Sequence, residues 1–284
     1  MEDYTPVCEK VRSPVVGGLF YPDNGEETEE QLLRFRMKEG KGLAQAILAP
    51  HGSWDISGNI AGAAFSAAMG RAEKAGGNLS GVSRVAILGP IHKAHEEGIF
   101  LTDSDCFLTP LGNIPVDREM TDELASCGTR LEINDIPHLA EHSIEVLLPF
   151  VKYCFPGAAI IPVLMGGTRP ALISVLARAL RLVLEPVMDE SLIVVSCNLA
   201  MNGARELALE EAEECVRLLR GKDAETFGRG LREGRISACG GGLIAALLEC
   251  GLVSDLAADV ISGPIVTSRD EKNRTVYYGA LSYG

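Results

Sequence analysis

Two histidines have surroundings that suit the binding of a metal ion. His51 follows the apolar run of residues 44–48, and His92 follows a second apolar run, residues 84–88. Each run is typical of a buried strand, and open α/β sheets bind ligands beyond the carboxyl ends of their strands. For a single histidine in such a loop, a structural role explains the residue as well as a functional one. Because the pattern occurs twice, we expect both histidines to converge on one crevice.

Cys239 is the third candidate ligand. It is followed by three glycines, residues 240–242, and by the apolar residues 243–248, a pattern that predicts a helix. The dipole and the free N–H groups at a helix N-terminus favour a thiolate. Two imidazoles and one thiolate can form a metal site that keeps a coordination position open. The alternative, a small residue selected for close packing, stays open.

Three further histidines are less informative. His142, with Glu141 before it, precedes residues 144–151, whose apolar side chains have helical spacing. We therefore place both residues at the start of a helix. His95 lies among charged residues and His138 follows a proline in a loop, so we expect neither to be a metal ligand.

The composition narrows the classes of partner. The 284 residues have a formal net charge of -13 and no Lys/Arg-rich run, which argues against nucleic acid and anionic membranes as partners. No apolar run is long enough to span a membrane, and the first residues have no secretory signal, so we expect a cytoplasmic protein. In that compartment the eight cysteines, none in a C-x-x-C pair, should be reduced thiols, mostly in the core.

Strand and helix patterns alternate along the chain, which predicts an α/β fold in one domain, residues 1–284. We expect a largely parallel sheet with helices on both faces. The predicted strands are residues 44–48, 84–88, 98–102, 158–164, 191–196, 259–262 and 275–283. The predicted helices lie within residues 23–42, 60–69, 117–127, 144–151, 170–187, 205–221, 224–232 and 240–248. We interpret residues 110–115 as a turn-rich connection.

Taken together, these stretches resemble the Memo family, called AmmeMemoRadiSam system protein B in prokaryotes. Each matching segment is short, but they occur in the right order over nearly the whole chain. The segments are residues 14–22, 49–51, 88–92, 109–112, 141–145, 161–164, 194–196 and 239–240. Jointly they are specific for the family.

The resemblance implies a fold similar to that of the class III extradiol dioxygenases, which are non-haem iron enzymes. It implies that His51, His92 and Cys239 bind iron or copper, in a context of redox chemistry. We count His142 with these three as a catalytic candidate. The residues that we expect around the ligands are Trp54, Glu141, Asn198 and Met201.

The chain departs from the family pattern near the expected site. Asn198 stands where members commonly have aspartate, Met201 where they have histidine, and Trp54 where they have tyrosine. An amide cannot act as a carboxylate base and a thioether cannot shuttle a proton, so we expect ring-cleaving dioxygenase activity to be absent or low. The Met201 thioether would favour copper if it faced the metal. Alternatively, Met201 fills an apolar gap.

Several functions stay open, because a fold alone cannot choose between them. The first is a metal-dependent redox or oxygenase-like enzyme that acts on a small molecule or a peptide. The second is a metal-binding or protein-recognition module that has lost catalysis. The third is a hydrolase that uses Ser143 or Cys239 with a histidine, which the lack of a nucleophile elbow disfavours.

Overall fold

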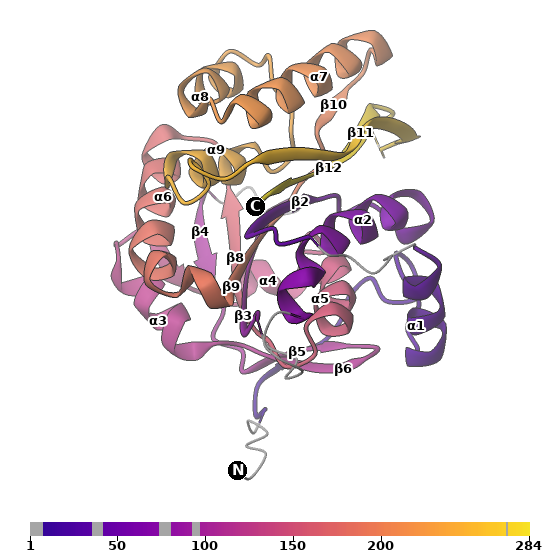
Figure 1. Cartoon of the computed structure of the whole chain (residues 1–284), viewed down its shortest axis with the longest axis vertical. Helices are drawn as coiled ribbons and strands as arrows, with labels where there is room; N and C mark the ends of the chain where they lie inside the picture. Colours follow the sequence, from indigo (N-terminus) through magenta and orange to yellow (C-terminus); the bar gives the residue numbers. More distant parts are fainter. Residues whose placement is uncertain (1–7, 36–41, 74–80, 93–96, 271) are drawn as a thin grey trace.

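Nine strands form one mixed sheet within residues 8–35, 42–73, 81–92, 97–270 and 272–284, which the computed structural model describes (Figure 1). Four parallel strands make its centre, in the order β2 (Ala46–Ala49), β9 (Ser191–Ser196), β3 (Arg84–Pro90) and β8 (Ala159–Gly166). Their carboxyl ends therefore meet at one edge. The α/β class and the parallel centre are confirmed.

The outer strands of this sheet run mostly antiparallel to their neighbours. Beyond β2 lie β12 (Thr275–Tyr283), β10 (Ala200–Asn202) and β11 (Ala258–Arg269). Beyond β8 lie β4 (Gly98–Leu101), which is antiparallel to β8, and β7 (Leu131–Ile133), which is parallel to β4. The predicted strand at residues 259–262 is thus longer than expected, and β7 and β10 were not predicted.

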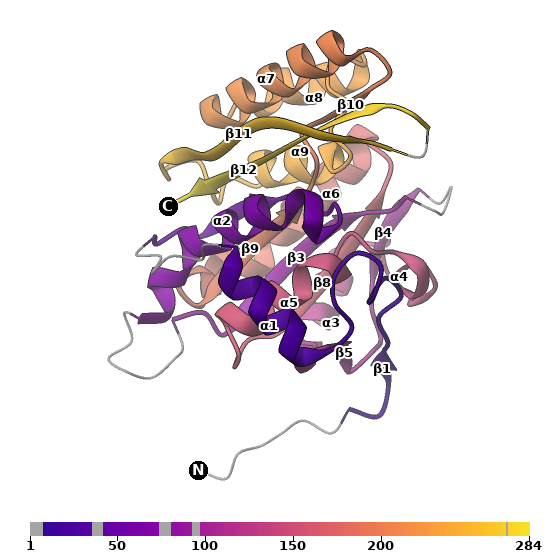
Figure 2. The ribbon, with the colours of Figure 1, turned by 90° about the vertical axis from the view of Figure 1, so that its right-hand side faces the viewer.

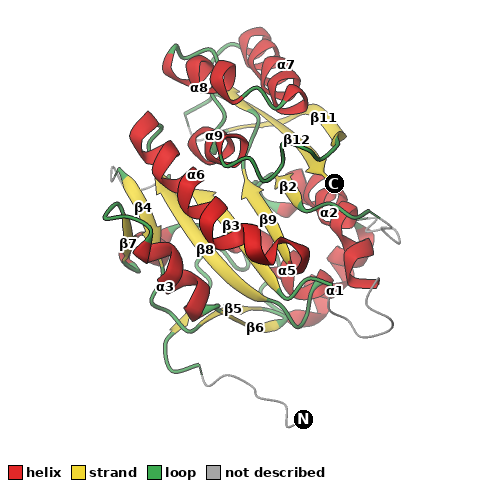
Figure 3. Ribbon diagram, turned by 60° about the vertical axis from the view of Figure 1, so that its left-hand side comes forward, coloured by secondary structure: helices red, strands yellow, loops and turns green. Residues whose placement is uncertain are grey.

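Helices cover both faces of the sheet (Figures 2 and 3). Side chains that alternate along β2 enter two separate apolar clusters: Leu48 belongs to one and Ile47 to the other. The Ile47 cluster includes side chains from α1 (Gly25–Arg34), α2 (Trp54–Glu73) and α5 (Leu148–Cys154). The Leu48 cluster contains α3 (Arg118–Ser126), α6 (Pro170–Leu184), α7 (Arg205–Gly221), α8 (Ala224–Arg232) and α9 (Gly241–Glu249).

Burial on both faces explains why the central strands are continuous apolar runs. Every residue of β2 and of β9 is buried. Short helical segments connect the longer elements: α4 (Ile136–Ala140), η1 (Glu145–Leu147) and η2 (Glu185–Glu190). None of the helices in the described residues is both long and apolar enough to cross a membrane. The helix expected within residues 23–42 is observed as α1, Gly25–Arg34. Residues 36–41 of that expected range lie outside the described part.

A small second sheet ties the N-terminal segment to the domain. Strand β1 (Val11–Arg12) pairs in parallel with β5 (Cys106–Thr109), and β5 forms a hairpin with β6 (Gly112–Pro115). The interpretation of residues 110–115 as a turn-rich connection was therefore wrong for residues 112–115, which form β6, and holds only for the turn at residues 110–111. The glycine and the proline in this stretch indicated a turn, but Gly112, with φ +103°, allows the tight hairpin turn and the strand continues beyond it.

Cys8 and Cys106 form a disulfide bond beside this small sheet. The expectation that all eight cysteines are reduced thiols is therefore wrong for these two. The pairing depends on β1 and β5 being neighbours, which the spacing of the two residues in the sequence does not reveal. The other six form no disulfide bond, and four of them are buried, as expected for core residues.

Candidate metal centre

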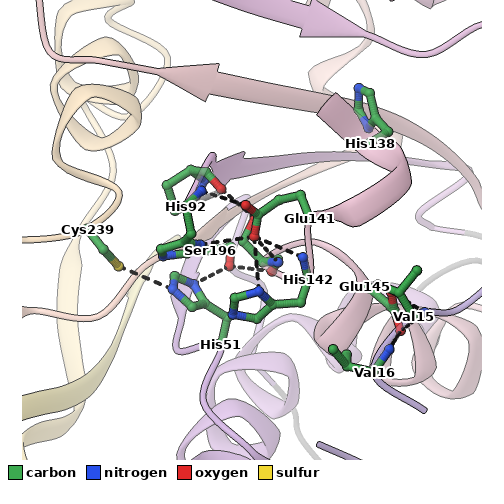
Figure 4. A network of polar contacts seen from close by, with 12 residues as sticks. Val15, Val16, His51, His92, His138, Glu141, His142, Glu145, Ser196 and Cys239 are labelled. Atoms are coloured by element: carbon green, nitrogen blue, oxygen red, sulfur yellow. Dashed lines mark hydrogen bonds and ion pairs between the residues drawn. The ribbon is translucent and has the colours of Figure 1, made fainter. Parts of the chain in front are cut away.

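The three predicted ligands meet at the carboxyl edge of the parallel strands (Figure 4). His51 comes two residues after β2, His92 two residues after β3, and Cys239 two residues before α9. One ligand atom from each of these side chains lies within 4.8 Å of the other two. The convergence that the sequence pattern predicted is therefore present in the structure.

Two glycines allow the ligand-bearing segments to approach the strands. A Cβ atom at Gly240 would lie 2.8 Å from the carbonyl oxygen of Ser196, so glycine lets the turn at Cys239 pack on the end of β9. A Cβ atom at Gly89 would lie 2.5 Å from Ser143 Oγ. Glycine at that position lets the segment that contains Glu141 and Ser143 lie against β3.

Hydrogen bonds fix the ring of His51 with one nitrogen directed toward Cys239. We call His51, His92 and Cys239 the ligand group. The Ser196 hydroxyl donates to the carbonyl oxygen of Ser143 at 2.6 Å, which uses its single proton. It must therefore accept the Nδ1–H of His51, 2.7 Å away. The other nitrogen, Nε2, lies 3.3 Å from Cys239 Sγ. Its lone pair is thus directed to the place where a metal ion would bind.

A carboxylate orients the ring of His92. Glu141 Oε1 lies 2.9 Å from His92 Nδ1, and Oε2 accepts the His92 backbone N–H at 2.6 Å. The backbone N–H groups of His142 and Ser143 donate to Oε1 as well, each at 2.9 Å. These bonds leave Nε2 of His92 for a metal, as in the carboxylate–histidine pairs of known metal sites.

Glu141 could itself be counted as a ligand, because it forms a second compact group with His92 and His142. Its two oxygens already accept four hydrogen bonds, however, and its side chain is almost fully buried. A metal ion would have to replace those bonds. The group of His51, His92 and Cys239 is therefore the better site.

The charges at the site favour a thiolate. Burial favours the neutral thiol, but the facing rings of His51 and His92 lower the pKa of Cys239 to about 5. Burial also opposes protonation of His92, yet contacts with Cys239 and Glu141 raise the pKa of this imidazole to about 10. Burial opposes ionisation of Glu141, while its bonds with His92 lower its pKa to about 2. A metal cation can replace the proton that this arrangement holds.

The donor atoms fit a transition-metal ion. Metal–nitrogen and metal–sulfur bonds of about 2.0 and 2.3 Å place two tetrahedral ligands roughly 3.5 Å apart. The distance of 3.3 Å between His51 Nε2 and Cys239 Sγ agrees with that value. A cavity of about 70 Å³ beside Cys239, lined by residues that include Ile91 and Met165, leaves room for a small ligand.

Asn198 and His142 lie next to the ligand group. The backbone N–H of Asn198 donates to Cys239 Sγ at 2.9 Å, and its side-chain oxygen accepts the backbone N–H of His51 at 3.4 Å. The ring of His142 stacks on that of His92, with centroids 4.9 Å apart, and lies 6.0 Å from that of His51. Phe20 packs edge-on against His142.

Two other predicted residues contact apolar neighbours. The indole of Trp54 donates to the carbonyl of Val146 at 3.0 Å and packs in an aromatic group with Tyr21 and Phe150. Met201, in β10, is partly buried against the Ile47 cluster. These positions agree with packing roles for both side chains.

The remaining candidates lie elsewhere or have other partners. His138 is buried, and its Nε2 hydrogen bonds to the carbonyl oxygen of Phe100 at 3.1 Å, apart from the ligand group (Figure 4). Ser143 is buried and donates to the carbonyl of Pro90 at 2.8 Å, so it is not presented as a nucleophile. His95 lies outside the described residues.

Sequence reasoning missed Ser196, the partner of His51. A polar residue at the end of an apolar strand, beside two strands that end in ligands, is the signal that could have found it. It also missed Arg12 and Glu145, which form a buried ion pair, with Arg12 bound as well to the carbonyl oxygen of Glu141. These two are 133 residues apart in the chain, and no local pattern connects them.

The comparisons with known proteins identify a family for this chain. The model of the Memo-like protein family matches residues 12–259. A MEMO1 family protein of Thermotoga neapolitana is 31% identical over 257 residues, which cover 86% of this chain and 90% of the relative. A MEMO1 family protein of Thermotoga maritima is 30% identical over 252 residues, 84% of this chain and 87% of the relative. The chain belongs to the Memo family.

Proposed function

We propose that this protein binds one iron or copper ion through Nε2 of His51, Nε2 of His92 and Sγ of Cys239, and uses it in redox chemistry on a small molecule or a peptide. The observation that supports this most is the preparation of both rings: each has its Nδ1 engaged by a partner and its Nε2 left for the ion. Two histidines that served only in packing would not need hydrogen-bond partners that direct both Nε2 atoms to the same place.

The donor set favours these two metals over hard ions such as magnesium or calcium. Imidazole nitrogen suits copper and iron, and a thiolate shifts the preference toward copper, especially Cu(I). The low pKa of Cys239, about 5, provides the thiolate at neutral pH. We therefore expect copper to bind more tightly than iron in equilibrium titrations.

A bound iron or copper ion would supply electron transfer at an open coordination position. His142 is the side chain best placed to hold or move a proton there, since its ring stacks on His92 and faces His51. Asn198 also contacts Cys239 and His51, but its amide has no proton to exchange at neutral pH. Ring cleavage of catechol-type substrates should therefore be absent or slow, because acid–base assistance is worth about 10²–10⁴-fold in rate.

A protein that binds metal without catalysis is the second candidate. It is favoured by the amide of Asn198, whose oxygen accepts the backbone N–H of His51 and so supports the loop. It is also favoured by the packing of Met201 against the core. In this case the wild type would retain the ion. Its oxygen consumption in the presence of a reductant would not exceed that of the His51→Ala or Cys239→Ser variant.

Cys239 and His51 alone could also act as a nucleophile and its base, since 3.3 Å separates Sγ from Nε2. The two proposals differ in the effect of metal on the thiol. A metal ligand is protected from alkylation when the ion is added, whereas a nucleophile that binds no metal stays reactive. Iodoacetamide labelling with mass spectrometry distinguishes them at Cys239.

Metal analysis of protein purified without an affinity tag tests the proposal. We expect near-stoichiometric iron or copper in the wild type and loss of the ion in His51→Ala and Cys239→Ser. Cys127→Ser is the matched control, because Cys127 is also a free, partly exposed cysteine but lies at the end of α3. Equal metal content in all four proteins, with the fold intact by circular dichroism, would refute the assignment.

A further inference from the structure

One short segment holds both histidine ligands. Glu141 binds the ring and the backbone N–H of His92. Two residues later, the carbonyl oxygen of Ser143 accepts the Ser196 hydroxyl that in turn binds His51. A displacement of residues 141–143 would therefore disturb both rings at once.

Arg12 binds this segment through three of its groups. Its Nη2 donates to the carbonyl oxygen of Glu141 at 2.7 Å, and its Nε donates to that of His138 at 3.1 Å. Its Nη1 forms an ion pair with the carboxylate of Glu145. Three separate groups of the stretch between residues 138 and 145 are thus bound by one planar guanidinium, a geometry that the point charge of a lysine cannot reproduce.

The ion pair of Arg12 with Glu145 is buried, and its carboxylate has several further hydrogen-bond partners. The side chains of Arg12 and Glu145 are 2% and 1% exposed. Glu145 also accepts the backbone N–H groups of Val15 and Val16, each at 2.9 Å, and the hydroxyl of Tyr21 at 2.8 Å. A buried charged pair is a poor source of stability by itself, so a role in fixing geometry accounts better for its presence.

The strand that bears Arg12 is itself held by a neighbouring strand, a disulfide bond and an ion pair. Val11 and Arg12 pair with β5, Cys8 is bonded to Cys106, and Lys10 forms an ion pair with Asp135 at 2.9 Å. The guanidinium therefore projects from an anchored strand into the segment. This arrangement can transmit the position of the N-terminal segment to the metal ligands.

We infer that Arg12 is a positioning residue of the metal centre: it fixes the segment through which Glu141 and Ser143 orient His92 and His51. This inference rests on the proposed metal site, but it concerns residues that do not contact the ion. It assigns a function to the ion pair of Arg12 with Glu145, and it makes the N-terminal segment part of the centre.

The substitution Arg12→Lys tests the inference. Lysine keeps a charge for Glu145 but cannot also bind the two carbonyl oxygens. We expect Cu(I) and Zn(II) to bind about 10–100-fold more weakly in competition titrations with a chelator, the usual range for groups that orient metal ligands. In metal-free protein, hydrogen exchange at the three backbone amides that donate to Glu141 should become faster.

Arg84→Lys is the matched control. Arg84 also forms an ion pair, with Asp117 at 2.9 Å, but it lies at the other end of β3 from His92. We expect this variant to change neither the metal affinity nor the exchange of those three amides. An equal loss of affinity in both arginine variants would mean that general destabilisation is responsible, and would overturn the inference.

A double variant keeps the test decisive if Arg12→Lys does not fold. Arg12→Met with Glu145→Gln removes both buried charges, and the glutamine oxygen can still accept from Val15, Val16 and Tyr21. We expect this protein to fold and to bind metal about 10–100-fold more weakly than the wild type. Unchanged affinity would overturn the inference alone. A wild type that binds no metal would show instead that the proposed function had failed, and the inference with it.

Discussion

His51 and His92 are oriented by partners of opposite character. His51 is 2% exposed, and its Nδ1 binds a neutral hydroxyl that leads to a backbone carbonyl. His92 has a side chain that is 29% exposed, and a carboxylate holds both its ring and its backbone N–H. One proposed ligand is thus enclosed and held by neutral groups, while the other is partly exposed to solvent and held by a charge.

The difference has a physical reason. Packing against buried neighbours already limits the rotation of His51, so a neutral hydrogen bond is enough to select the tautomer. His92 is less enclosed, and a charge-assisted bond, about twice as strong as a neutral one, compensates for this. We therefore expect the two partners to differ in their effects on metal binding, and four predictions test this comparison.

The largest expected effect concerns His138, a third histidine with a neutral partner. Burial lowers its pKa to about 4, whereas an unfolded histidine titrates near 6.5. Below about pH 6.5 the unfolded chain takes up a proton that the folded chain refuses, so stability is lost as the pH falls from about 6.5 to about 4. The total loss should be about 3 kcal/mol.

Chemical denaturation of metal-free protein across this pH range measures the effect of His138. In His138→Gln, where the amide can still donate to the Phe100 carbonyl, the loss of stability between these pH values should be smaller by that amount. The comparison of two slopes does not depend on the absolute stability of the variant. Parallel slopes would mean that His138 is protonated in the folded protein, contrary to the behaviour expected of a buried ring with a neutral partner.

The second prediction concerns the charged partner of His92. In Glu141→Gln an amide replaces the carboxylate, and its NH₂ group would face N–H groups that need an acceptor. We expect Zn(II) or Cu(I) to bind roughly 100-fold more weakly in chelator competition. Glu132→Gln, at an exposed carboxylate that binds Asn134, should bind metal like the wild type. An affinity loss below about threefold in Glu141→Gln would break the comparison at its stronger side.

The third prediction concerns the neutral partner of His51. Ser196→Ala removes the hydroxyl but leaves the ring enclosed, so we expect metal affinity to fall only about tenfold. Ser191→Ala is the control, because Ser191 begins the same strand and donates to the carbonyl of Val187. If Ser196→Ala lost as much affinity as Glu141→Gln, enclosure would not be what holds His51, and the distinction between the two ligands would be wrong.

The sequence predicted the parts of this centre that depend on local pattern. Continuous apolar runs predicted the central strands, because burial on both faces imposes that pattern. The loops that follow two of these runs contain the two histidines. The β5–β6 hairpin was missed because its glycine and proline obscured the alternation of short strands. Arg12, Ser196 and the disulfide of Cys8 with Cys106 were missed because their partners are brought together only by the folded chain.

The smallest expected effect concerns Met201, for which the sequence allowed two interpretations. As a weak ligand in place of a histidine, its thioether would favour Cu(I). As a packing residue, it would not influence the ion. The structure places Met201 in β10, partly buried against the Ile47 cluster. Its backbone N–H donates to Ser237 Oγ at 2.9 Å, which fixes the strand rather than the side chain.

We therefore expect Met201→Leu, which keeps the volume and removes the sulfur, to leave Cu(I) affinity within about twofold of the wild type, well below the usual 10–100-fold effect of groups that orient ligands. Asn198, whose backbone N–H bonds to Cys239, lies nearer to the ion than Met201 by these contacts. Titration of both proteins against a Cu(I) chelator measures the difference. A tenfold loss of Cu(I) affinity with Zn(II) affinity unchanged would place the thioether at the metal. The open side of the centre would then have a soft ligand of its own, and the comparison between one enclosed and one charged histidine would no longer describe the whole site.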